Sequence, residues 1–434
     1  MPYPAARRFG EMSYQIRLYG QLKHEYGARG IERIFGHVEK CLQAARRRME
    51  RLPIDKALAK KEPDALPRIR ALRPKGPRRM WKSFDAVAYP ARLEGALLAR
   101  MAGCTLGAIV EGWEVKAMQD WAKQIGDPFP PTRYWSRAKD PERTRYSASR
   151  CKEYTLPLMN GVPVDDDIAY TLIGLLIVEE YGPKFTTADV GRAWVKYLPV
   201  ACTAEEVALK NLKAGIPANR AALKGNPYVQ WIGADIRSDP WGWLAPGWPE
   251  KAAEMAYRDA YLSHRRNGIY GEMFFAAAQA AAFAADDPVE AIRIGVTEIP
   301  RDCTLAHDVK WALREGKRIR DYRQARAAVD KRFKGMHQVH TNNNACLSIF
   351  GLMIGGLDVT KVISQTVAMG LDNDCTAATS GSIVGAVVGR KGVPKHWHAK
   401  FNNTVRSYLI GKPRFGIDDL VRRFTKQAGA IAGG

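Results

Sequence analysis

Apolar residues recur at three- and four-residue steps along most of the chain, and this spacing predicts amphipathic helices. Two of these helices lie between Tyr14 and Arg51, with a break near Gly27–Gly30, where glycines interrupt the pattern. The next segment, from Pro53 to Arg79, holds five prolines among many cations. Proline removes a backbone donor and fixes φ, so we expect an irregular linker or a belt lying on another surface, with a boundary near residue 85.

Helical spacing dominates again beyond that boundary, whereas runs with the period-two alternation of strands are scarce. The predicted helices are Arg92–Ile109, Ile168–Tyr181, Thr187–Tyr197, Pro249–Ser263, Tyr270–Ala284, Pro288–Ile294, Ala306–Glu315, Arg318–Phe333, Ala345–Gly355, Val359–Met369 and Thr376–Val388. We therefore expect an all-α fold, in which a single large orthogonal helical bundle follows a basic helical N-terminal arm.

Two of these helices are expected to pack at short range. The segment from Phe274 to Phe283 is rich in alanine and apolar on almost every side, which is typical of a buried helix. Gly381, Gly385 and Gly389 recur every four residues and would line one face of the last predicted helix. That helix could approach its neighbours very closely.

The net charge of +22 over 434 residues is concentrated at the start of the chain. Residues 1–85 hold 21 Lys and Arg against 9 Asp and Glu, a net charge of +12. Such a surface suits nucleic acid or another anionic partner, but no recognised nucleic-acid motif accompanies it, and a solvated helical arm is the simpler explanation of the charge.

Cysteine usage and hydropathy indicate a cytoplasmic protein. The seven cysteines are scattered and form no Cys-x-x-Cys pair, so neither a disulfide framework nor a structural zinc site is expected. We find no apolar run long enough to span a bilayer and no leading segment that resembles a signal peptide, so no membrane partner is expected.

Candidate chemistry lies in two acidic clusters that precede apolar helices. Asp165, Asp166 and Asp167 come directly before one helix, and Asp372 and Asp374 come before the glycine-studded one. Carboxylates at a helix start gain from the helix dipole, so capping alone explains one or two of them. Three adjacent carboxylates repel one another, and a divalent cation shared with the second cluster would cancel that repulsion. Glu111, which ends an apolar helix beside Gly112, could act as a general base or a further ligand.

Taken in order, these elements resemble the ADP-ribosylglycohydrolase family. The family pattern reads roughly G-D-x-L-G-x-x-x-E, then T-D-D-T, then D-x-D-T followed by spaced glycines. In this chain the matching segments are Gly103-Cys-Thr-Leu-Gly107 with Glu111, Asp165-Asp-Asp-Ile168, and Asp372-Asn-Asp-Cys375 with Gly381 and Gly385. A bacterial branch is also similar in the segments from Asn226 to Arg237, Leu262 to Met273, Ile299 to Pro300 and His340 to Ala345.

The resemblance covers about residues 86–412. It implies that residues 1–85 form the arm and linker, that 86–412 form the helical domain with a central metal site, and that 413–434 form a C-terminal tail. The implied activity is hydrolysis of the glycosidic bond between ADP-ribose, or a related ribosyl group, and an acceptor.

The resemblance also implies site residues and a cofactor, which is Mg²⁺ or Mn²⁺, as two ions. The implied catalytic residues are Glu111, Asp166 and Asp374. The implied metal ligands are Asp165, Asp166, Asp167, Asp372, Asp374 and Cys375. The implied substrate-binding residues are His264, Asn267, Tyr270, Gly271, Glu272, His340 and Asn344. Each histidine could equally be a satisfied structural imidazole, and Glu272 could be an acid that stabilises a helix start.

Four positions depart from the family pattern. Cys104 replaces an aspartate, Asp165 and Ile168 replace the threonines of the first metal motif, and Cys375 replaces a threonine ligand of the second. These changes bear on metal identity and substrate more than on fold. Two alternatives therefore stay open. One is an N-glycosidase of a nucleoside or a dinucleotide-derived small molecule, and the other is a non-catalytic, crystallin-like relative that binds ADP-ribose.

Overall fold

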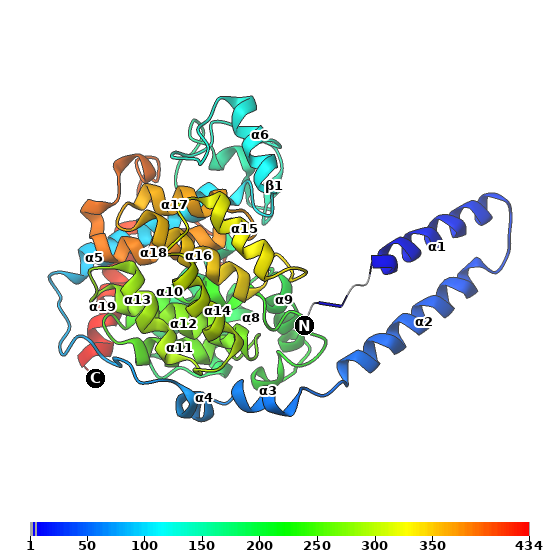
Figure 1. Cartoon of the computed structure of the whole chain (residues 1–434), viewed down its shortest axis with the longest axis horizontal. Helices are drawn as coiled ribbons and strands as arrows, with labels where there is room; N and C mark the ends of the chain where they lie inside the picture. The colour runs from blue at the N-terminus through cyan, green and yellow to red at the C-terminus, as the bar shows by residue number, and fades with distance from the viewer. Residues whose placement is uncertain (1–2, 5–6, 434) are drawn as a thin grey trace. The chain divides into compact units, whose positions relative to one another are not determined.

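The computed structural model describes residues 3–4 and 7–433. The chain forms two compact units, residues 1–60 and residues 61–434 (Figure 1). The division lies within a short helix, α3 (Lys56–Lys61), and each unit is described by itself.

The first unit is a helical hairpin of α1 (Arg7–Glu25) and α2 (Ile31–Glu50). Gly27 and Gly30 turn the chain with φ of 71° and 85°, a conformation that glycine adopts at little cost. The Phe35 ring packs directly over Gly20, where an added Cβ would lie 2.1 Å from the ring. The two predicted helices and their break are thereby confirmed.

Residues 61–85 begin the second unit and lie as a belt on the rest of it. Helix α4 (Leu66–Leu72) is followed by Arg73 and Arg78, whose guanidinium groups both contact the buried carboxylate of Glu298. Near the start of the belt, the buried Glu62 carboxylate accepts hydrogen bonds from Asn267 and from the backbone N–H of Thr304. The belt interpretation of the proline-rich segment holds for these residues, and its two short helices were not predicted.

The second unit is built from helices. The α-helices are α5 (Tyr89–Ala108), α6 (Val115–Ile125), α7 (Asp166–Tyr181), α8 (Thr187–Tyr197), α9 (Thr203–Lys213), α10 (Asp239–Leu244), α11 (Pro249–Ala260), α12 (Asn267–Ala282), α13 (Pro288–Gly295), α14 (Thr304–Glu315), α15 (Tyr322–Arg332), α16 (Thr341–Gly355), α17 (Val359–Ala368), α18 (Asn373–Gly392) and α19 (Ile417–Gly433). The 3₁₀-helices are η1 (Cys151–Tyr154), η2 (Ala218–Arg220), η3 (Ile232–Arg237), η4 (Val296–Glu298) and η5 (Lys395–Trp397). The strands are β1 (Thr144–Arg145) with β2 (Ser149–Arg150), and β3 (Val405–Arg406) with β4 (Arg414–Phe415), each pair antiparallel.

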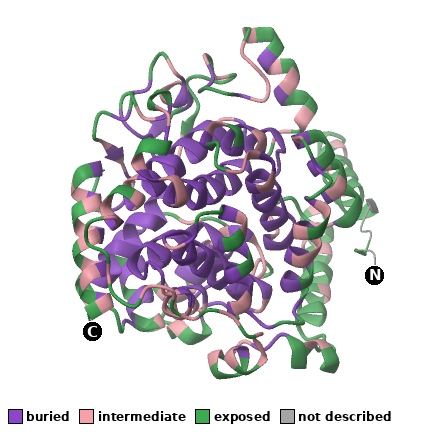
Figure 2. Ribbon diagram, turned by 60° about the vertical axis from the view of Figure 1, so that its left-hand side comes forward, coloured by how far each residue is buried: buried purple, intermediate pink, exposed green. Residues whose placement is uncertain are grey.

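Helices at the centre of this unit are buried along most of their length (Figure 2). Every residue of α12 is buried, as its alanine-rich sequence predicts, and it packs between α11 and α13. The closest packing joins α5 to α18, where glycines let the two backbones meet. An added Cβ at Gly385 would lie 2.3 Å from the carbonyl oxygen of Gly95.

The all-α bundle is confirmed, and each predicted helix of the bundle is present within a few residues. Helices α6, α9, α10 and α19 were not predicted. The last of these covers most of residues 413–434 and packs against α5, α7 and α10. Within residues 3–4 and 7–433, no helix combines the length and the apolar character that a bilayer crossing needs.

Candidate metal centre

The contact between α5 and α18 brings the segment that ends at Glu111 together with the second acidic motif. Near the C-terminal end of α5, a Cβ added at Gly107 would lie 2.5 Å from both the Cα and the N of Asp374. Glycine is therefore required for this approach. This approach places the start of α18 beside the end of α5. Glu111 follows shortly after the end of α5 in the chain.

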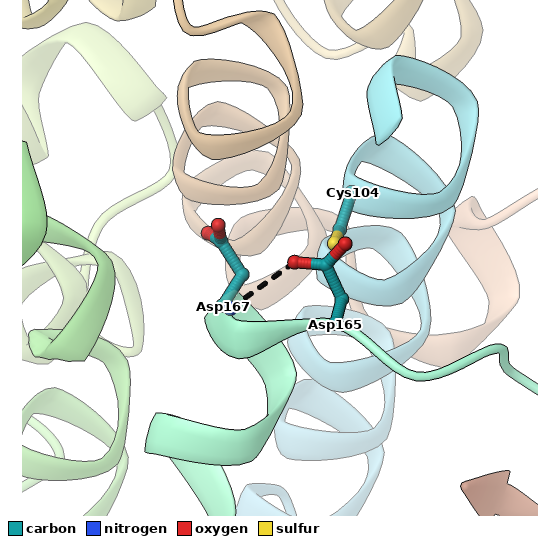
Figure 3. Close-up of side chains that lie close together, drawn as sticks. All are labelled: Cys104, Asp165 and Asp167. Carbon is teal, nitrogen blue, oxygen red and sulfur yellow. Dashed lines mark hydrogen bonds between the residues drawn. The ribbon is translucent and has the colours of Figure 1, made fainter. Parts of the chain in front are cut away.

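The first acidic motif caps α7 and faces α5. The side chain of Asp165 is the N-cap and accepts a hydrogen bond of 3.2 Å from the backbone N–H of Asp167 (Figure 3). Figure 3 also shows the Cys104 thiol of α5 beside the Asp165 carboxylate. Asp166 accepts a hydrogen bond of 2.6 Å from the hydroxyl of Tyr146. Capping thus satisfies part of this motif, but it leaves three adjacent carboxylates within one helix start.

The second acidic motif lies at the start of α18, with Asp372 at the N-cap position, and follows a strained residue, Leu371, whose φ is 60°. The backbone N–H of Asp372 donates to the Asn344 side-chain oxygen (3.2 Å), which fixes the entry into the helix. The Cys375 thiol then donates to the Asp167 carboxylate over 3.1 Å. This bond joins the two motifs directly, although 208 residues separate them.

Three groups of side chains could each hold a cation, since their ligand atoms lie within 4.8 Å of one another. They are Cys104 with Asp165 and Asp167, Asp167 with Asp374 and Cys375, and Glu111 with Asp372 and Asp374. All are buried except Glu111, whose side chain is 41% exposed. Buried carboxylate oxygens are the donors that Mg²⁺ and Mn²⁺ prefer, so the donor set fits such ions. Glu111 is the member that solvent can reach.

Burial and mutual repulsion disfavour the ionised forms of these acids. Burial, and then the charges of Asp165 and Asp167, raises the pKa of Asp166 well above its usual range. Burial and the Glu111 charge raise the pKa of Asp374 well above its usual range and that of Asp372 to about 7. Desolvation favours the neutral form of an acid, and a bound cation would reverse that preference.

The two cysteines at the centre are thiols in these surroundings. Burial and the nearby carboxylates raise the pKa of both Cys104 and Cys375 well above the usual range. A neutral thiol is a weak ligand, so Cys375 serves as a hydrogen-bond donor to Asp167. The coordination of a cation by Cys375 stays a prediction.

An arginine that the sequence analysis did not single out lies among these acids. Arg145 comes from β1, and its guanidinium contacts Glu111 (2.8 Å), Asp165 (3.0 Å) and Asp374 (3.1 Å). Nothing in the local sequence marks Arg145, because its three partners come from other elements.

A further carboxylate was also missed. Asp235, in η3, is 1% exposed, and neither of its side-chain oxygens has a hydrogen-bond partner among the described residues. Burial raises its pKa well above the usual range. The signal was present, since Asp235 lies in one of the segments that resemble the bacterial branch, but an isolated aspartate there has no motif of its own.

Four of the predicted substrate-binding residues belong to two polar networks near the start of α12. Asn267 bonds Glu62, Gln230 and the backbone of Leu305, and Tyr270 donates to the carbonyl of Pro63. The carboxylate of Glu272 pairs with Arg237 and accepts from Trp241. His264 lies beside Ser263 and Glu205 of the same network, and burial lowers its pKa well below the usual range.

The remaining predicted residues contact Asp235 or the starts of α16 and α18. Gly271 fits against Asp235, since an added Cβ would lie 2.0 Å from its carboxylate oxygen. His340 caps α16 by accepting from the backbone N–H of Asn342 (3.1 Å). Asn344, as described above, holds the backbone of Asp372. Their binding of substrate stays a prediction, while their structural contacts are direct.

Comparison with known proteins places the bundle in a family. The family model described as ADP-ribosylglycohydrolase matches residues 85–430, which is most of the chain. Among solved structures, 45 chains match, and one, described as an ADP-ribosylglycohydrolase-related protein complex, has a TM-score of 0.51 at 16% identity. The match covers 79% of this chain and 99% of that one, and identity this low shows a shared fold alone. No curated protein sequence matches.

Proposed function

The chain belongs to the ADP-ribosylglycohydrolase family, and on that premise we propose that it is a cation-dependent hydrolase of the glycosidic bond between ADP-ribose and an acceptor. One observation carries the proposal. The acidic starts of α7 and α18 meet in one buried cluster through the bond from Cys375 to Asp167, with Glu111 at the exposed edge. A glycoside hydrolase needs carboxylates in such an arrangement, both to stabilise positive charge at the anomeric carbon and to handle the proton of water.

The buried carboxylates and Glu111 have different parts in this proposal. Asp166, Asp167, Asp372 and Asp374 would hold Mg²⁺ or Mn²⁺, which supplies Lewis-acid stabilisation when bound. Glu111 is reached by solvent, so the oxygen of its carboxylate that binds no cation can accept the proton of the water whose oxygen bonds to the anomeric carbon. The bond from that carbon to the acceptor breaks, and the acceptor leaves with the electron pair and takes up the proton that Glu111 accepted from the water.

A panel assay tests the activity. The full-length protein is incubated with Mn²⁺ or Mg²⁺ and with peptides that carry ADP-ribose on arginine, serine or acidic residues, and free ADP-ribose is measured by chromatography. We expect release from at least one acceptor. A free nucleoside in the same panel separates a general N-glycosidase from an ADP-ribosyl hydrolase, and binding of ADP-ribose without release from any acceptor would contradict the proposal.

Substitution of Asp374 tests the acidic cluster itself. We expect Asp374→Asn to lower the release rate at least about 100-fold, because it removes a carboxylate shared by two of the cation-binding groups. Asp120→Asn is the matched control, since Asp120 is an exposed aspartate that pairs with Lys116 on the surface of α6. Equal losses in the two variants would show that the effect is not specific to the cluster.

A further inference from the structure

The guanidinium of Arg145 bridges three carboxylates that come from three different parts of the fold. Its Nη2 donates to both Asp165 (3.0 Å), at the start of α7, and Asp374 (3.1 Å), at the start of α18. Its Nη1 donates to Glu111 (2.8 Å), just after α5, and to the carbonyl oxygen of Ala108 (2.6 Å). The side chain is only 9% exposed. Arg145 is therefore a cation held inside the acidic centre.

The oxygens that Arg145 binds belong to carboxylates that a divalent cation would need. Glu111 and Asp374 are two of the three members of one cation-binding group, and the Arg145 nitrogens contact both. The guanidinium bonds one oxygen of Glu111 and one oxygen of Asp374, at 2.8 and 3.1 Å. A cation in this group needs oxygens of the same two carboxylates, so the guanidinium and the cation compete for them.

The group of Asp167, Asp374 and Cys375 differs from this one. Arg145 contacts Asp374 but has no hydrogen bond or ion pair to Asp167 or Cys375 in the described part of the chain. A cation could bind there while the guanidinium stays in place. The two cation positions that share Asp374 therefore differ in whether a cation there competes with Arg145.

The segment that carries Arg145 is a small hairpin with few backbone contacts. Strands β1 and β2 pair over only two residues each, and the turn between them holds Tyr146 and Ser147 at φ of 50° and 53°. Non-glycine residues in this region are each strained by about 1 kcal/mol or more. At its tip, the hairpin bonds the centre through Arg145 and through the Tyr146 hydroxyl on Asp166. The Tyr146 ring also packs on Tyr408, and the Ser149 hydroxyl accepts a hydrogen bond from the backbone N–H of Val164, so loss of the Arg145 contacts would loosen the hairpin at its tip.

We propose that Arg145 is a resident counter-ion of the acidic centre, and that a divalent cation binding at Glu111, Asp372 and Asp374 displaces it and releases the hairpin of residues 144–150. The inference rests on the proposed function, since it assigns the regulation of the same site. The hairpin is then a lid that Arg145 holds against the acidic centre and that loosens as the second cation enters.

Titration of the full-length protein with Mn²⁺ alone, followed by calorimetry, tests the competition. We expect Arg145→Gln to tighten the weaker Mn²⁺ site about tenfold or more, because the cation no longer displaces a bound guanidinium. Arg145→Lys keeps the charge but loses the two-pronged guanidinium, so its Mn²⁺ affinity should lie between those of the wild type and Arg145→Gln. Arg150→Gln is the matched control, because Arg150 is an exposed cation of the same hairpin that pairs with Glu142 instead. Equal Mn²⁺ affinities for the wild type and Arg145→Gln, or no Mn²⁺ binding by either, would overturn the proposal.

Amide hydrogen exchange of the wild-type protein provides a second readout that needs no variant to fold. We expect Mn²⁺ to speed exchange in residues 144–150 and to slow it at the starts of α7 and α18. Slower exchange of the hairpin with Mn²⁺ would show that Arg145 stays in place. Mn²⁺ competition without ADP-ribose release would refute the hydrolase alone, whereas release with identical Mn²⁺ affinities would refute the lid alone.

Discussion

The imidazole of His340 has a pKa of about 4, because burial and the neighbouring His337 both disfavour its charged form. In its neutral form, Nδ1 accepts the backbone N–H of Asn342 and caps α16. Protonation would remove that acceptor. The folded pKa lies below the unfolded value of about 6.5, so the stabilisation is fully present above about pH 6.5 and is lost as the pH falls toward 4.

We therefore expect His340→Asn to flatten the acid side of the stability profile. Asparagine keeps a cap acceptor but does not titrate. Urea unfolding should show that the free energy of unfolding falls less between pH 7 and pH 5 in the variant than in the wild type. Complete protonation of His340 would lower it by about 3 kcal/mol in the wild type. His307→Asn serves as the control, since His307 is an exposed histidine on α14. An unchanged pH dependence in His340→Asn would contradict the assignment.

Single residues also show where sequence reasoning stops. The aspartates of the centre could be predicted because each belongs to a short motif at a helix start. Arg145 and Asp235 could not, because only long-range packing gives them their surroundings: one is a lone cation on a two-residue strand, and the other is a lone carboxylate in a 3₁₀-helix. Their chemistry depends on partners that the local sequence does not name.

At the scale of elements, the contact between α5 and α18 determines where the acids meet. The glycine spacing predicted that α18 approaches a neighbouring helix closely, and the structure shows that this neighbour is α5. Gly381 faces Ala99, and Gly385 faces Gly95. Helices with clear periodicity could be predicted, whereas the short α10, with its Trp-Gly-Trp sequence, offers too few residues for a period. The partner helix could not be predicted, because periodicity indicates a buried face and not what covers it.

We expect Gly385→Ala to destabilise the protein by about 1–3 kcal/mol and to weaken Mn²⁺ binding. The new Cβ would lie 2.3 Å from the Gly95 carbonyl oxygen, and a backbone atom cannot rotate away. The helices must therefore separate, which moves the start of α18 from α5. Thermal unfolding and Mn²⁺ calorimetry measure the two effects.

Gly429→Ala in α19 is the control for this variant. Its Cβ would meet the Phe84 ring at 3.5 Å, an ordinary contact. Alanine is the better helix former, so this change should be neutral or stabilise by up to about 1 kcal/mol. A Gly385→Ala protein as stable as Gly429→Ala would mean that the two helices can separate at no cost.

At the scale of the whole molecule, the compact units and the predicted domains divide the chain at different places. The units divide between Lys60 and Lys61, while the boundary predicted from composition lies near residue 85, where the family match also begins. The belt between these points contacts the second unit through buried charges. Glu298 is 1% exposed and pairs with both Arg73 and Arg78, and Glu62, 2% exposed, pairs with Arg266.

Two truncations decide which boundary matters for folding. We expect removal of residues 1–60 to leave the unfolding temperature of the second unit unchanged, since the belt is intact. Removal of residues 1–85 takes away both arginine partners of Glu298, and an unpaired buried carboxylate costs about 3–5 kcal/mol. The shorter protein should therefore unfold at a clearly lower temperature. Adding Glu298→Gln to the shorter protein should restore part of the lost stability, because the substitution removes the unpaired charge. Equal unfolding temperatures for the two truncations would instead place the boundary of the folding unit at residue 85.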